Sequence, residues 1–165
     1  MKLNSLRDLY VGELKDLYDA EARLVKALPK MSKAAASPEL RTAFDQHLEE
    51  TRMHADRLAR IFERMGESPK GGKCKGIEAI IDEGEDVMEH DAPAAVSDAA
   101  LISAAQRLEH YEIASYGTAY TFARRLGLDH DARLLEETLR EEKEADKKLT
   151  TLAESYINEE AKSAR

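Results

Sequence analysis

Apolar residues recur every three or four positions along most of the chain, which is the spacing of one buried face of an α-helix. The first stripe continues to about residue 35, and Asn4 or Ser5 can cap its start. Pro29 lies inside this stretch and is expected to kink it. The apolar positions are Leu3, Leu6, Tyr10, Leu14, Leu17, Leu24, Leu28 and Met31. They predict one long first helix.

A second long helix is predicted directly after the first. Ser37 is suited to be its N-cap and Pro38 its first residue, because that position needs no amide hydrogen. Gly66 is the expected end of the helix. Its apolar stripe consists of Leu40, Phe44, Leu58, Ile61, Phe62 and Met65.

Residues 66–97 differ in character from the two stripes before them. They begin with GESPKGGKCKG, a loop by its Gly, Pro and Ser content, and continue with GIEAIIDEGEDVMEH, which predicts a short extra helix. Pro93 breaks the chain again, and Ser97 is the expected N-cap of a third long helix ending at Gly127. A fourth long helix follows and leads into a polar tail, expected to be frayed from about residue 158.

The order of these elements predicts an all-α fold. Two helical hairpins with tight turns are joined by one long crossover, 66–97, and this is the ferritin-like variant of the four-helix bundle. No stretch alternates apolar and polar residues with β-branched enrichment, so no strand is predicted. A length of 165 residues fits a single domain, 1–165, that is long enough to bury a core.

Composition and charge narrow the function classes. Charged residues make up 35% of the chain and the formal net charge is −8, which argues against a nucleic-acid or anionic-membrane surface. Cys74 is the single cysteine, so an intramolecular disulfide and a multi-cysteine metal site are both excluded. With no apolar run of signal-peptide or membrane-spanning length, we expect a cytoplasmic protein.

Acidic and histidine side chains interrupt the apolar stripes of the second and third long helices. Glu109 and Glu112 lie one turn apart in phase with the apolar residues around them. His47, Glu50 and His54 share a face with the stripe of the second helix. Buried carboxylates need protons, hydrogen-bond donors or cations as compensation.

The first and fourth long helices each add acids to the same interior. Glu21 is in phase with the first stripe, and Glu142 and Asp146 are in phase with the last one. Carboxylates from all four helices, joined by histidine, are the ligands of di-iron and di-manganese sites in helix bundles. Zinc is a further candidate. The alternative for any single one of these glutamates is a boundary position from which the carboxylate reaches water.

Several segments of the chain are distinctive. They are LYDAE at 17–21, HLEET at 47–51, the stretch DAALISAAQRLEHYEIASYG at 98–117, and LREEK at 139–143 with KLT at 148–150. These segments resemble the bacterial YciE/YciF family of ferritin-like, stress-associated proteins. The resemblance spans nearly the whole chain and implies a rubrerythrin-like bundle that forms homodimers.

The string Glu109-His-Tyr-Glu112 is also similar to the third-helix motif of rubrerythrin, which implies that both glutamates are iron ligands. Glu21 matches the first-helix ligand position in the same way. The second and fourth helices depart from the Glu-x-x-His motif of such proteins, because Met53 follows Glu50 and Ala145 follows Glu142 at that spacing.

The departure leaves the histidine ligand open. Either His47 or His54 replaces the usual second-helix histidine, although His54 is explained equally well as a boundary residue over Leu58. Asp146 would replace the histidine of the fourth helix. The expected metal ligands are Glu21, His47, Glu50, Glu109, Glu112, Glu142 and Asp146.

The expected function is that of a metal-binding protein holding two iron or manganese ions and acting in stress. Its chemistry would be the reaction of the reduced pair with peroxide or dioxygen. The alternative is a structural or interaction protein, a helical dimer without redox activity. No motif identifies a substrate or an electron donor, and the cysteine module of rubrerythrin is missing.

Overall fold

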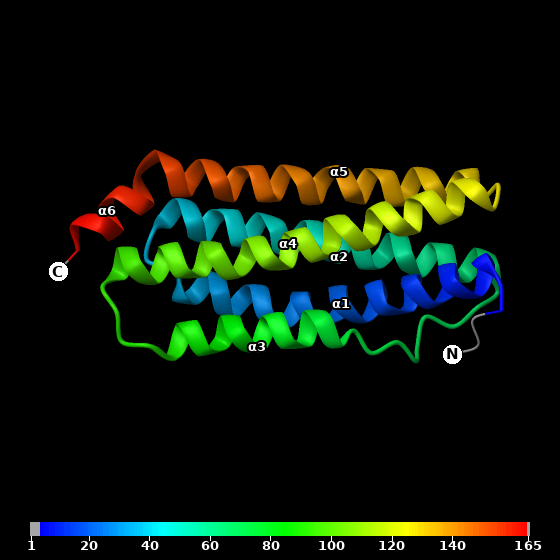
Figure 1. The fold of residues 1–165 in the computed structure, drawn as a ribbon, viewed down its shortest axis with the longest axis horizontal. Coiled ribbons are helices and arrows are strands. Elements are labelled where there is room, and N and C mark those ends of the chain that lie inside the picture. Colours follow the sequence, from blue (N-terminus) through cyan, green and yellow to red (C-terminus); the bar gives the residue numbers. More distant parts are fainter. Residues whose placement is uncertain (1–3, 165) are drawn as a thin grey trace.

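The computed structural model describes residues 4–164, and helices account for nearly all of them. Four helices are long and form the bundle, a fifth lies in the crossover, and the chain ends in a π-helical turn and a short sixth helix (Figure 1). The elements are α1 (Leu6–Ala34), α2 (Pro38–Met65), α3 (Lys75–Glu89), α4 (Ala94–Arg125), α5 (Asp129–Leu152), η1 (Ala153–Ile157) and α6 (Asn158–Ser163).

The helices pair as two hairpins, as the sequence predicts. α1 packs on α2 and α4 on α5, and the hairpins meet through the pairs α1–α4 and α2–α5. The crossover carries α3 along the outside of α1 and α4, where it lies beside both (Figure 1). The prediction of an all-helical bundle with a short extra helix between its second and third long helices is confirmed. None of the helices over residues 4–164 is long and apolar enough to cross a membrane.

The predicted helix ends are largely confirmed by the capping contacts. Ser5 accepts the amide of Asp8, and Ser37 accepts the amide of Leu40 with proline at the first position of α2. Gly66 ends α2 in the left-handed conformation, with φ 68°, where a side chain would be strained. These contacts fix the two hairpins at their ends.

Two predicted boundaries are corrected by the structure. α4 begins at Ala94, three positions before the expected cap, because Pro93 stands at the N-cap position and Ser97 donates to the Ala92 carbonyl instead of capping. The segment expected to fray from about residue 158 is helical to Ser163 as α6. Pro29 lies within α1 without ending it.

The hydrophobic core is divided into two clusters along the bundle axis. One contains Leu24 of α1 and Phe44 of α2, and the other contains Leu17 and Leu58 of the same helices. On each long helix the residues between the two clusters are the buried acids and histidines. The bundle therefore has an apolar core at both ends and a polar layer in its middle.

Candidate metal centre

The polar layer consists of six buried side chains that come from all four long helices. They are Glu21 of α1, His47 and His54 of α2, Glu109 and Glu112 of α4, and Glu142 of α5. Glu21, His54, Glu112 and Glu142 have no exposed surface at all. The inward placement that the stripes predict for these residues is confirmed, because helical periodicity leaves each of them in phase with its apolar neighbours.

The first group of potential ligands comes from α2, α4 and α5. It comprises His47, Glu109, Glu112 and Glu142, whose ligand atoms all lie within 4.8 Å of one another. His47 Nε2 is 3.2 Å from Glu109 Oε1 and 3.7 Å from Glu142 Oε2. Three carboxylates and one imidazole at this separation can surround one divalent cation.

The second group shares a residue with the first. It comprises Glu21, His54 and Glu142, again within 4.8 Å of one another. His54 Nδ1 is 2.9 Å from Glu142 Oε1 and 3.5 Å from Glu21 Oε1. Glu142 presents one oxygen to His47 and the other to His54, so it is the residue that would bridge two ions.

Most inward atoms of this layer have no hydrogen-bond partner. The buried atoms without a hydrogen bond of good geometry are Glu21 Oε2, His54 Nδ1, Glu109 Oε2, both oxygens of Glu112 and both oxygens of Glu142, although His54 Nδ1 lies 2.9 Å from Glu142 Oε1. Leaving one buried polar group unsatisfied costs about 1–3 kcal/mol, more when the group is charged. Seven such atoms at one place indicate that the residues fit cations rather than a purely structural network.

The outward nitrogen of each histidine is held by a more exposed carboxylate. Glu141 lies 2.9 Å from His54 Nε2 and in turn accepts from the Arg57 guanidinium. His47 Nδ1 lies 3.4 Å from Glu50 Oε2. Such contacts select the tautomer that turns the other nitrogen inward as a ligand.

A tyrosine holds the first-helix acid from the opposite side. The Tyr116 hydroxyl is completely buried and donates to Glu21 Oε1. This contact leaves only Oε2 of Glu21 without a partner. From the sequence, Tyr116 is most simply a core residue of the third-helix stripe, and it is one of four tyrosines of which one could hydrogen-bond a ligand carboxylate; the structure shows this contact at Tyr116.

Two of the expected ligands lie outside both groups. Glu50 is 39% exposed and reaches the layer only through His47. Asp146 accepts from Gln106 at 3.0 Å and lies 3.4 Å from His110 Nε2, at the outer edge of the α4–α5 interface. His54 is instead brought into the layer, although periodicity alone explains it equally well as a boundary residue.

Burial raises the pKa values of three glutamates in the layer, Glu21, Glu112 and Glu142. Burial, reinforced by the neighbouring Glu142 and Glu21 carboxylates, raises the pKa of Glu112 well above its ordinary value of 4.5. Burial also raises the pKa of Glu21 and of Glu142, although His54 opposes the shift in both. Without cations the layer therefore retains protons that exposed carboxyl groups release.

The pKa values of the two histidines in the layer are raised as well. Burial alone would lower the pKa of His54, but Glu142 and Glu21 outweigh it and raise that pKa to about 10. Burial opposes the charged form of His47 too, yet the Glu109 carboxylate raises its pKa well above 6.5. The carboxylates around both imidazoles therefore favour their protonated forms in the metal-free layer.

The metal-free protein is expected to lose stability as the pH rises. A histidine whose folded-state pKa is raised stabilises the fold below its unfolded value of 6.5, and this contribution disappears as the pH approaches about 10. The raised pKa values of the buried glutamates act with the same sign. We expect a loss on the order of 2 kcal/mol across this window, measured by urea unfolding in chelator.

Added metal should reverse the pH dependence of the protein's stability. Cations must displace the protons, so binding should release protons and strengthen as the pH rises. Metal-free protein whose stability is constant or increasing over the same window would contradict this electrostatic description.

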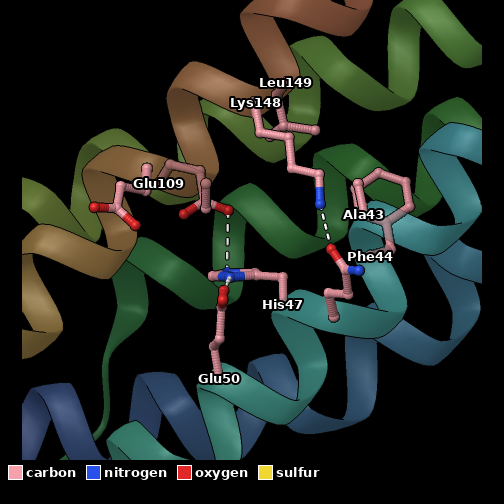
Figure 2. A pocket seen from close by; sticks show the side chains of 10 residues that line it. Ala43, Phe44, His47, Glu50, Glu109, Lys148 and Leu149 are labelled. Carbon is pink, nitrogen blue, oxygen red and sulfur yellow. Dashed lines mark hydrogen bonds and ion pairs between the residues drawn. The ribbon is translucent and has the colours of Figure 1, made fainter.

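A pocket connects the first group to the surface. It has a volume of about 220 Å³ and lies between α2 and α5, with Phe44 and Leu149 on its walls. His47 and Glu109 line its inner part, and Glu109 and Glu50 approach the His47 ring from opposite sides (Figure 2). A small solute can therefore approach one edge of the layer.

The family model described as "Domain of unknown function (DUF892)" matches residues 5–162. The chain belongs to this family. The resemblance carried by the sequence segments is confirmed as well: Protein YciF of Escherichia coli is 43% identical over 162 residues, which is 98% of each chain.

Several solved structures share the fold of this chain. The crystal structure of the E. coli stress protein YciF superposes with a TM-score of 0.91 at 43% identity, covering 94% of this chain and 99% of that one. YcfI from Rhodopseudomonas palustris, described as a proposed structural protein, has a TM-score of 0.88 at 40% identity, covering 91% and 96%. A protein from Xanthomonas campestris, 23% identical, shares the fold with a TM-score of 0.74 over 93% and 94%.

Proposed function

We propose that this protein binds two iron or manganese ions in the middle of its helical bundle. His47, Glu109, Glu112 and Glu142 hold one ion, and Glu21, His54 and Glu142 hold the other. The observation that carries the proposal is the set of seven unpartnered buried atoms that face one another between the helices.

The formal charge of the four carboxylates in the layer supports the binding of two divalent ions. Four carboxylates carry a formal charge of −4, which two divalent cations balance. Oxygen and imidazole ligands without thiolate favour iron or manganese, with zinc as a further candidate. Cys74 donates its thiol hydrogen to the Tyr111 hydroxyl and belongs to neither group.

The proposed chemistry is peroxide or dioxygen reduction in a stress response. A pair of iron or manganese ions supplies the electrons for that reaction when it is bound and reduced. The chain contributes a bridging carboxylate, fixed imidazole tautomers and a layer closed off by two apolar clusters. The description of the relative YciF as a stress protein supports this assignment.

Metal analysis of protein purified without chelator tests the proposal. We expect about two iron or manganese ions per chain, as in two-metal sites built from carboxylates. Chelation should remove them, reconstitution should restore them, and the reduced, loaded protein should consume peroxide faster than the metal-free protein. Protein that stays metal-free after reconstitution would contradict the proposal.

A second candidate is a structural or interaction protein that forms a homodimer. The description of the R. palustris relative as a proposed structural protein favours it. It predicts a dimer in analytical ultracentrifugation and stability that does not change with metal. The two candidates differ in the metal response, because a homodimer is also expected for the first.

A further inference from the structure

We propose that divalent cations enter the layer through the pocket between α2 and α5, where Glu50 binds them first and His47 passes them to Glu109. This inference rests on the proposed function and adds a route and a transfer ligand to it. Glu50 is thereby assigned a role outside the final coordination of either ion.

The pocket leads from solvent to an unpartnered buried ligand. Its walls include the apolar side chains of Phe44 of α2 and of Ala145 and Leu149 of α5, beside the polar residues Gln46, Glu144 and Lys148. At its inner part is Glu109, whose side chain is only 4% exposed and whose Oε2 has no hydrogen-bond partner. A free carboxylate oxygen at the end of a partly apolar pocket is a binding position for a cation.

Ligand atoms follow one another inward along this pocket. The Glu50 side chain is 39% exposed, that of His47 is 7% exposed, and the two lie 3.4 Å apart. His47 Nε2 is then 3.2 Å from Glu109 Oε1, so the imidazole stands between the two carboxylates (Figure 2). Because a cation is costly to move bare into apolar surroundings, it must exchange each lost water for a protein ligand.

Other sides of the layer are less suited to cation entry. On the other part of the α2–α5 interface the Arg57 guanidinium, itself only 12% exposed, pairs with Glu137 and with Glu141 beside His54, so the carboxylate on that side is already occupied. The α1–α4 side is covered by α3, which packs on both helices (Figure 1). The inner end of the α2–α5 pocket is therefore the favourable approach.

One positive charge lies at the rim of the pocket. The Lys148 ammonium group donates to Gln46 Oε1. Glu144 also lines the pocket and adds a mostly exposed carboxylate to the same rim. The rim therefore carries one charge of each sign.

Stopped-flow loading of the metal-free protein with Co²⁺, read by its visible absorbance, tests this route. Glu50→Gln keeps an oxygen that can bond His47 but removes the charge, so loading should slow about fivefold, the factor that corresponds to ~1 kcal/mol for a charge pair at 4 Å in water. Ala145→Leu should narrow the pocket and slow loading and chelator-driven release by the same factor. Both variants should still bind two ions.

Matched controls separate the route from general effects on the bundle. Glu49→Gln removes an exposed acid one position away that pairs with Arg52. Ala99→Leu enlarges a residue lining a different pocket, on α4 beside Asn158. Both should load at the wild-type rate.

The outcomes distinguish the route from the function on which it rests. If Glu50→Gln and Ala145→Leu bind two ions at the wild-type rate, the route is overturned while the proposed function stands. If the wild-type protein binds no Co²⁺ at equilibrium, the proposed function fails and the route with it. Glu50→Gln alters a partly exposed residue, so it decides the question even if Ala145→Leu does not fold.

Discussion

Glu142→Gln is expected to abolish the binding of both ions. Glu142 is the one residue common to both ligand groups, and each of its oxygens faces a different histidine. Saturating metal at about a thousand times its dissociation constant should stabilise the wild-type protein by about 4 kcal/mol. This stabilisation should disappear in the variant, measured by thermal unfolding with and without metal and by metal analysis.

Glu144→Gln is the matched control for this experiment. Glu144 lies on the same helix, but its side chain is 72% exposed and points to solvent. The Glu144→Gln protein should retain both ions and the full metal-dependent stabilisation. A Glu142→Gln protein that still binds two ions with unchanged affinity would show that Glu142 does not bridge them.

Glu112→Met is expected to stabilise the metal-free protein while weakening metal binding. Glu112 is fully buried, neither of its oxygens has a partner, and burial raises its pKa. Replacing such a group by an apolar side chain of similar size commonly stabilises a protein by about 1–4 kcal/mol. Urea unfolding in chelator should show the increase, and unfolding with metal should show the loss of response.

A Glu112→Met protein that is less stable without metal and still fully stabilised by metal would contradict this interpretation. If Glu112→Met destabilised the metal-free protein, the carboxyl group would be part of a satisfied structural network. Leu108→Met provides the control, since it changes a buried apolar residue one turn away on the same helix without removing a charge. Volume-conserving changes of this kind usually cost less than about 1.5 kcal/mol.

The fold followed from the sequence because local signals agreed with one another. Ser37 with Pro38, and Gly66 at the end of α2, marked the hairpin boundaries by backbone chemistry that does not depend on tertiary packing. The start of α4 was placed too late, because a serine at residue 97 resembles a cap whereas the fixed φ of Pro93 ends the crossover earlier.

Periodicity placed the inward glutamates and His47 correctly, but it left His54 open and misplaced the outer acids Glu50 and Asp146. Helical phase places Glu21, Glu109, Glu112 and Glu142 toward the core, and the structure has them there. Phase has a resolution of about one third of a turn, so it cannot separate an interior from a boundary position. Glu50 and Asp146 lie at that boundary, where neighbouring polar groups on His47 and Gln106 determine which way they turn.

The direct test of the two-ion layer is the crystal structure of the manganese-loaded protein with anomalous diffraction data. Two peaks about 3.5–4 Å apart are expected, as in two-metal sites, with Glu142 between them. One should lie against His47, Glu109 and Glu112, and the other against Glu21 and His54. A loaded crystal with no peak between the helices, or with manganese only at the surface near Asp146 and His110, would contradict the account.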